Sequence, residues 1–210
     1  MPSNPPSLTL SEAVDRASEL AATGERRLLG LVGPPGAGKS TLSAVLAESI
    51  GPRMIVAGMD GFHLANAELL RLGRRDRKGA PDTFDVDGYV TLLRRLRRQG
   101  HPLYAPLFDR DLEESIGSAV RIEPEVPLVV TEGNYLLFDE NGWDAVRSEL
   151  DEVWYLQVDD VERRRRLVHR RLGHGDNPEH AEQWVHTVDE ANALRVVATR
   201  ALADYLVEMP

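Results

Sequence analysis

The sequence contains no cysteine. This absence excludes disulfide bonds, thiolate metal sites and cysteine nucleophiles, and it is consistent with a reducing compartment. The N-terminus lacks a basic segment followed by an apolar one, and no apolar run approaches the length of a membrane-spanning helix. We therefore expect a cytoplasmic protein without a membrane partner.

The sequence also lacks an excess of positive charge, since its formal net charge is -9 over 210 residues. A general nucleic-acid binder needs a basic face, so this balance argues against nucleic acid as a partner. Hydrophobic residues make up 42% of the chain, which is enough to bury a sizeable core. We expect a single domain over residues 1–210, with a flexible, proline-rich arm over residues 1–7.

Short apolar segments alternate with segments of helical periodicity. The predicted strands cover residues 28–32, 54–57, 126–130, 153–158 and 205–208. The predicted helices cover residues 11–23, 41–50, 86–99, 161–172 and 188–204, and another helix begins at Asn177. This alternation predicts βαβ crossovers and a five-stranded parallel sheet with helices on both faces, an α/β fold. Ligands of such sheets bind beyond the carboxyl ends of the strands.

A complete phosphate-binding motif follows the first of these strands. Residues 33–41, Gly-Pro-Pro-Gly-Ala-Gly-Lys-Ser-Thr, match the P-loop pattern at every position. The glycines let backbone amides point at phosphate oxygens, Lys39 adds a positive charge, and Ser40 offers a hydroxyl to Mg²⁺. We expect the phosphates of ATP to contact Gly33, Pro34, Gly36, Ala37, Gly38, Lys39, Ser40 and Thr41. The motif predicts the three-layer α/β/α sandwich of P-loop NTPases.

Two carboxylates follow later strands and are expected to reach the same sheet edge. Asp60 follows the second strand, where it can accept a hydrogen bond from an acceptor hydroxyl and orient it towards the γ-phosphorus. Glu132 follows the third, where P-loop enzymes hold the shell of Mg²⁺. Each residue, taken alone, is also compatible with an ordinary position at the end of a strand.

Basic and aromatic side chains complete the candidate site. Arg166 and Arg170 lie one helical turn apart before the hinge-like segment 173–176, and we predict a small helical lid over about 163–180 that closes on the triphosphate. Residues 104–110 mix aromatic and charged side chains in an expected loop, which suits a pocket for a polar small molecule. A packed surface loop has the same composition.

Several motifs agree in order and spacing with a known superfamily. They are the P-loop and segments 60–63, 78–85, 104–110, 132–135, 166–170 and 189–192. The chain resembles the uridine kinase, phosphoribulokinase and pantothenate kinase superfamily, and more closely its bacterial nucleoside/nucleotide kinase branch, whose members include proteins labelled as fructose-transport-system kinases. The resemblance implies that Asp60 is the catalytic carboxylate, that Arg166 and Arg170 belong to the lid, and that Glu132 lies near the metal. With the residues above, it leads us to predict substrate contacts from His63, Lys78, Phe84, Tyr104, Phe108, Arg110 and Asn134.

These patterns lead to one main hypothesis. We expect an ATP- and Mg²⁺-dependent kinase that phosphorylates a hydroxyl of a nucleoside, a pantothenate-like compound or a sugar, with Lys39, Asp60, Arg166 and Arg170 as catalytic residues. The Gly-Phe-His that follows Asp60 departs from uridine kinase, and the chain is shorter than pantothenate kinase, so neither substrate follows from the resemblance. A nucleotide-switched regulatory protein and a simple NTPase stay open as alternatives. A homodimer is expected only by analogy with the fold.

Overall fold

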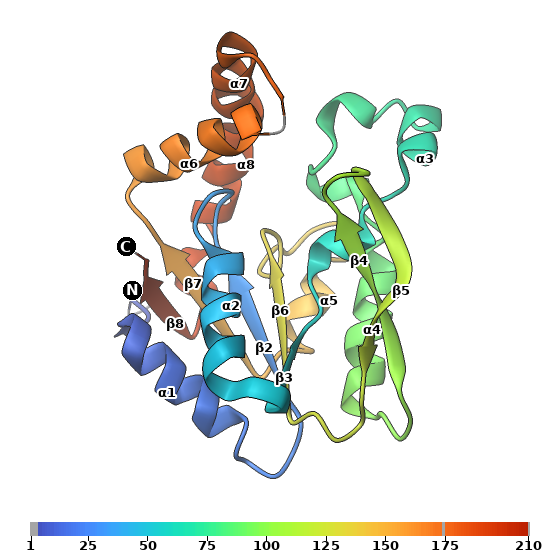
Figure 1. Cartoon of the computed structure of the whole chain (residues 1–210), viewed down its shortest axis with the longest axis vertical. Coiled ribbons are helices and arrows are strands. Elements are labelled where there is room, and N and C mark those ends of the chain that lie inside the picture. The colour runs from blue at the N-terminus through green and yellow to red at the C-terminus, as the bar shows by residue number, and fades with distance from the viewer. Residues whose placement is uncertain (1–3, 174, 210) are drawn as a thin grey trace.

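The computed structural model describes residues 4–173 and 175–209, and its centre is a six-stranded sheet. The strands are β1 (Ser7–Leu8), β2 (Arg27–Val32), β3 (Met54–Val56), β6 (Leu128–Gly133), β7 (Glu152–Gln157) and β8 (Tyr205–Glu208). They are all parallel and lie in the order β1-β8-β7-β2-β6-β3 (Figure 1). The parallel α/β fold is confirmed, whereas the expected number of five strands is one too few.

The additional strand comes from the segment expected to be a flexible arm. Ser7 and Leu8 pair with Leu206 and Val207, and the amide of Leu206 donates to the carbonyl oxygen of Pro6 at 2.9 Å. The pairing continues the sheet beyond β8, so the arm expectation is wrong for this part of residues 1–7. Residues 1–3 lie outside the described part of the chain.

One face of the sheet is covered by α1 (Leu10–Leu20) and α2 (Lys39–Ile50) (Figure 1). Thr9, rather than the expected Ser11, caps α1: its hydroxyl accepts from the amide of Glu12, whose carboxylate accepts from the Thr9 amide in return. The buried residues on this face come from both helices and from the strands beneath them. They include Ala13, Ala17, Leu42, Leu46, Leu29, Leu31, Val130 and Leu156.

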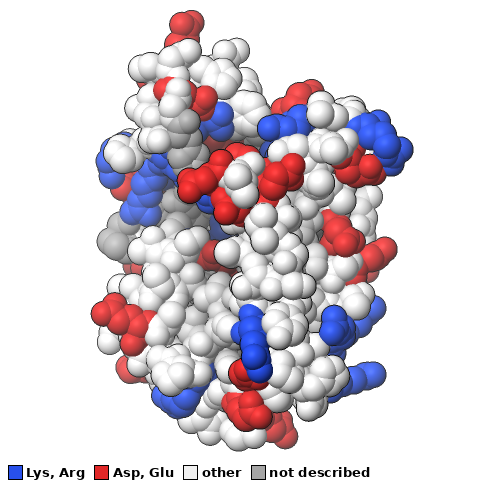
Figure 2. Space-filling model, turned by 45° about the vertical axis from the view of Figure 1, so that its right-hand side comes forward, with Lys and Arg blue, Asp and Glu red and all other residues white. Residues whose placement is uncertain are grey.

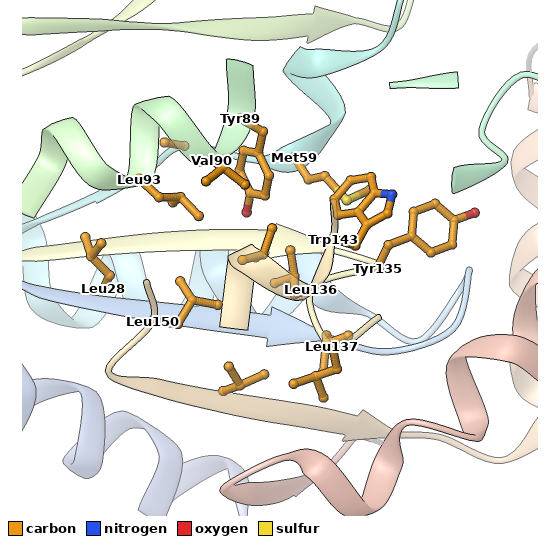
Figure 3. Packing of buried hydrophobic residues seen from close by; sticks show 14 of the residues in the cluster. Leu28, Met59, Tyr89, Val90, Leu93, Tyr135, Leu136, Leu137, Trp143 and Leu150 are labelled. Carbon is orange, nitrogen blue, oxygen red and sulfur yellow. The ribbon is translucent and has the colours of Figure 1, made fainter. Parts of the chain in front are cut away.

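The opposite face is covered by α4 (Val86–Arg97) and the short α5 (Asp144–Arg147), together with the chain around Trp143. Trp143 and Tyr135 lie side by side, with ring centres 5.6 Å apart (Figure 3). Their polar atoms hold the segment that precedes α4, because Trp143 Nε1 donates to the Pro81 carbonyl at 3.1 Å and the Tyr135 hydroxyl donates to the Gly79 carbonyl. This core therefore fixes the chain around Lys78.

A second, two-stranded sheet stands beside the main one. It consists of β4 (Leu103–Asp109) and β5 (Glu114–Ile122), paired antiparallel, and α3 (Asn66–Arg71) lies near its tip (Figure 1). Segment 104–110 is thus mainly strand rather than the expected loop. Pro106 has no amide hydrogen and is unfavourable inside a strand, so the sequence did not indicate one here. In the structure the pairing of β4 with β5 shifts in register between Ala105 and Leu107.

Helices α6 (Asp160–Gly173), α7 (Pro178–Trp184) and α8 (Glu190–Val197) follow β7, with a π-helical turn (Val185–Asp189) between the last two. Helices α6 and α7 rise above the carboxyl ends of the strands (Figure 1). The long helix expected over 188–204 ends instead at Val197, and a 3₁₀ turn (Arg200–Leu202) leads into β8. His174, part of the expected hinge, lies outside the described residues. No helix within residues 4–173 and 175–209 is long and apolar enough to span a membrane.

Candidate active site

The P-loop joins β2 to α2, and two of its glycines are required by the backbone. Gly36 and Gly38 have φ angles of 82° and 93°, in the left-handed region that favours glycine. A Cβ on Gly36 would also lie 2.9 Å from the carbonyl oxygen of Arg163, so the base of α6 rests on the loop. Gly38 is the N-cap of α2, whose first turn therefore presents its amides at the loop.

The ammonium group of Lys39 is enclosed by three oxygen atoms. Nζ donates to the carbonyl oxygens of Gly33 at 2.8 Å and Pro34 at 3.2 Å, and to Oδ1 of Asn134 at 2.7 Å. Burial lowers the pKa of Lys39 to about 8, although the charges of Asp60 and Glu132 oppose the shift. Asn134 therefore holds the P-loop lysine, and its expected contact with an acceptor stays a prediction.

Ser40, in the first turn of α2, and Glu132, near the end of β6, contact each other. Ser40 Oγ donates to Glu132 Oε1 at 2.9 Å, and Ser43 Oγ lies 3.3 Å from Oε2 of the same carboxylate. Strands β2 and β6 are paired in register, which places the P-loop and Glu132 at one sheet edge. A hydroxyl and a carboxylate are the oxygen ligands that Mg²⁺ prefers, so the two side chains fit the metal role expected for them.

Asp60 lies in a 3₁₀ turn (Met59–Phe62) after β3. Arg110 at the end of β4 donates to Asp60 Oδ2 at 2.6 Å. The turn packs directly on β4, because a Cβ on Gly61 would lie 2.5 Å from the carbonyl oxygen of Pro106. The second sheet therefore carries Arg110 to the carboxylate.

His63 lines the cleft, and its imidazole ring packs against the backbone of Asp60 and against two phenylalanine rings. Its Nδ1 is 2.8 Å from the Asp60 carbonyl oxygen, and its ring centre lies 4.1 Å from that of Phe84 and 4.7 Å from that of Phe108. Burial lowers the pKa of His63, so the ring is mainly neutral at pH 7. The ring thus packs against the two phenylalanines and the turn that carries Asp60, and its expected contact with an acceptor stays a prediction.

Lys78 also lines the cleft and lies close to the Phe108 ring. Its Nζ donates to Asn66 Oδ1 at 2.8 Å and to the Glu113 carbonyl oxygen. The Phe108 ring centre is 5.0 Å from Lys78 Nζ and 5.2 Å from Cζ of Arg110. Phe108 thus contacts two cations that both line the cleft.

Tyr104 does not belong to this group. Its register partner is Arg121 on β5, and 51% of the residue is exposed, outside the cleft lining. Neighbouring strand residues point to opposite sides, so the burial of Leu103 and Ala105 turns Tyr104 outward. The expected substrate contact of Tyr104 is therefore wrong for this structure.

The helices above the sheet supply the remaining cations. Arg166 Nε donates to Glu162 Oε1 at 2.8 Å, and Arg166 and Arg170 both line the cleft. Burial lowers the pKa of Arg170, and repulsion from the positive charge of Arg110 lowers it further. The pair is placed where a triphosphate on the P-loop would lie between it and the sheet.

Several residues of this wall were not predicted individually. Arg171 pairs with Asp176 at 2.6 Å and lies 4.5 Å from the ring centre of Trp184. Asp189 is buried at the π-helical turn, and burial raises its pKa against the lowering effect of Arg170. Asp189 belongs to the segment 189–192 that carries part of the resemblance, whereas no local pattern indicated Trp184.

These parts meet in a single cleft of about 720 Å³. The predicted residues that line it are Gly36, Gly38, Lys39, Ser40, Thr41, Asp60, His63, Lys78, Phe84, Phe108, Arg110, Glu132, Asn134, Arg166 and Arg170. Gly33, Pro34 and Ala37 lie behind this surface as buried parts of the loop. Figure 2 shows basic and acidic side chains on the two upper lobes that flank the hollow, and others over the lower part of the molecule.

Comparison with known proteins gives relatives that match most of the chain. No protein-family model matches it. A Schizosaccharomyces pombe protein named "Putative uridine kinase" is 36% identical over 78% of this chain and 74% of its own length. The Escherichia coli protein YggC, described as uncharacterized, is 33% identical over 88% of this chain and 78% of its own. The crystal structure of a "putative fructose transport system kinase" from Silicibacter is 38% identical, with a TM-score of 0.86 over 97% of this chain and all (100%) of that one.

The fold and the cleft define the class of protein, a P-loop small-molecule kinase that uses ATP. Within that class, the chain belongs to the nucleoside/nucleotide kinase-like family, the branch of the uridine kinase and pantothenate kinase superfamily that the sequence motifs indicated.

Proposed function

We propose that this protein transfers the γ-phosphoryl group of ATP to a hydroxyl of a small metabolite. The observation that carries this proposal is that the P-loop and Asp60 line the same cleft. The donor phosphates and an acceptor hydroxyl can therefore be held together, and phosphoryl transfer depends mainly on such positioning and on charge neutralisation. The nucleoside, pantothenate-like and sugar acceptors all remain within this proposal.

The donor half of the site consists of the P-loop and the arginines above it. In this proposal Gly36, Gly38 and Lys39 hold the β- and γ-phosphates, and Arg166 and Arg170 stabilise charge that develops on the transferred group. Ser40 and Glu132 would hold Mg²⁺, which supplies charge neutralisation at the phosphate oxygens when it is bound.

In the acceptor half, Asp60 orients the hydroxyl and takes its proton. The hydroxyl oxygen forms a bond to the γ-phosphorus while the bond from that phosphorus to the oxygen shared with the β-phosphate breaks, and ADP leaves. Arg110, 2.6 Å from Asp60 Oδ2, fixes the orientation of the carboxylate. One oxygen of Asp60 is engaged in this pair, so the other can accept from the hydroxyl.

The test compares ADP formation with and without candidate acceptors in the wild type and in Asp60→Asn. The substitution should lower acceptor-dependent turnover by about 10²-fold or more and leave ATP binding unchanged, since the amide cannot take the proton. Asp139→Asn, at an exposed position outside the cleft, is the matched control. Full transfer by Asp60→Asn would refute the assigned mechanism, and ATP consumption that no acceptor stimulates would indicate a simple NTPase.

A further inference from the structure

The aromatic side chains near Asp60 are occupied by packing. Phe84 and Phe108 are 7% and 8% exposed, and His63 lies between them. Trp184, on the opposite wall, is covered by the guanidinium of Arg171 at 4.5 Å. Phe84 and Phe108 line the cleft beside Asp60 with only this small exposed fraction, which leaves little ring surface for a planar base to stack on. The same part of the cleft is also lined by polar and charged residues, among them Lys78, Arg110 and Glu113.

Lys78 is the best-fixed cation at this end. Two neutral oxygens, Asn66 Oδ1 and the Glu113 carbonyl, hold its ammonium group and leave one of its three N–H donors unassigned. It forms no salt bridge with any acidic side chain in residues 4–173 and 175–209. Burial accordingly lowers its pKa, and the acidic side chains of Glu113 and Glu114 act only at longer range. A cation held in place by neutral groups beside a cleft is preorganised for an anion.

Arg110 supplies a second donor beside the hydroxyl site. One nitrogen of its guanidinium contacts Asp60, which leaves further N–H donors on a side chain that lines the cleft. Lys78 Nζ and Arg110 Cζ both lie about 5 Å from the ring centre of Phe108, so they are at most about 10 Å apart. The hydroxyl site at Asp60 and the two cations are therefore close together. A molecule that places its hydroxyl at Asp60 and a second group between the cations must be small.

Resting on the proposed kinase function, we propose that the acceptor is a compact, non-aromatic hydroxy compound that carries an anionic group, a carboxylate or a phosphate ester, bound by Lys78 and Arg110. The hydroxyl lies at Asp60 and the anion lies between Lys78 and Arg110, beside Phe108. Arg75, which also lines this end of the cleft, adds positive charge at its rim. Lys78 and Arg110 are then the residues that determine specificity.

The first arm of the test uses pairs of compounds that differ in the anionic group. Glycerol is compared with glycerate and glycerol 3-phosphate, ribose with ribose 5-phosphate, and panthenol with pantothenate, with uridine as the neutral aromatic compound. Transfer is measured as acceptor-dependent ADP release, and binding is measured separately by thermal shift in the presence of a non-hydrolysable ATP analogue. We expect the charged member of at least one pair to have a kcat/KM about 10- to 100-fold above its neutral counterpart, the range of one charge-assisted hydrogen bond. The carboxylate and phosphate pairs show which anion is recognised.

The second arm assigns the preference to residues. Lys78→Met should raise KM for the charged compound about tenfold or more while changing the neutral counterpart little, and Lys78→Arg should restore part of the loss. Arg110→Gln should lower kcat for both members of a pair, since Arg110 also holds Asp60, and should raise KM about tenfold for the charged member alone. Arg71→Gln removes an exposed arginine of α3 outside the cleft and is the matched control. A Lys78→Met protein whose thermal transition is lowered is set aside in favour of Arg110→Gln, since Arg110 is itself exposed.

The outcomes separate this inference from the kinase proposal. Equal or better transfer to neutral compounds, or an equal rise in KM for both members of a pair in the variants, would overturn the anionic acceptor and leave the kinase function standing. Binding of a charged compound without transfer would contradict the kinase function and retain the anion site. Failure of every charged compound to bind at millimolar concentration would overturn the inference.

Discussion

ATP binding should weaken as the pH rises from 7 to 9, because the nucleotide needs Lys39 in its charged form. Burial holds the pKa of this lysine at about 8 in the empty cleft. About nine lysines in ten are protonated at pH 7 and about one in ten at pH 9, whereas an ordinary lysine would stay charged throughout. If only the ammonium form binds, the apparent Kd rises about tenfold over this interval.

The same equilibrium predicts proton uptake on binding. At pH 8 about half of the Lys39 side chains are neutral before ATP arrives, so each binding event should take up about half a proton. The second pKa of a phosphate is near 6, below this window.

Isothermal titration calorimetry in buffers of different ionisation enthalpy measures both quantities. Lys39→Met should bind ATP weakly, with no dependence on pH between 7 and 9, because the titrating group is gone. A wild-type Kd that is constant over this range, with no proton uptake at pH 8, would refute the reasoning and place the pKa of Lys39 near that of an exposed lysine.

Two further changes test the metal site and the base of α6. Glu132→Gln should raise the Mg²⁺ concentration needed for half-maximal ADP formation by about 10- to 100-fold, and an unchanged Mg²⁺ dependence would remove Glu132 from the metal site. Arg163→Ala should lower the free energy of unfolding by about 2 kcal/mol in urea titrations, because the 2% exposed guanidinium is lost and Glu190 keeps only its pair with Arg164. Arg165→Ala, two positions along the same helix and 67% exposed, should change it by less than about 0.5 kcal/mol, and equal losses would contradict the assignment.

The donor half of the site could be predicted because it is local in the sequence. The P-loop is one contiguous segment, and its conformation depends on its own glycines at positions 36 and 38. Asp60 and Glu132 were found by a topological rule, since parallel strands bring their carboxyl ends to one edge. The sheet confirms that both side chains reach the cleft.

Features that depend on contacts between distant segments escaped prediction. The two residues of β1 carry no strand pattern of their own, and they pair only because β8 offers an unpaired edge. The outward direction of Tyr104 depends on the register of β4 with β5 around Pro106. The hydrogen bond between Lys39 and Asn134 joins residues 95 positions apart, and neither local sequence reports the other.

The contact between Gly36 and the base of α6 limits how the family's modules can be exchanged. The Arg163 carbonyl oxygen and the Leu167 side chain both lie within about 3 Å of the position of a Cβ on Gly36. A chimaera that takes its entire α6 from a relative must therefore place these two groups against Gly36 with sub-ångström accuracy, or the P-loop will be distorted. A junction placed after Leu167 keeps the native contact and exchanges only the distal helix, so we expect transplanted segments to be tolerated from that position onward.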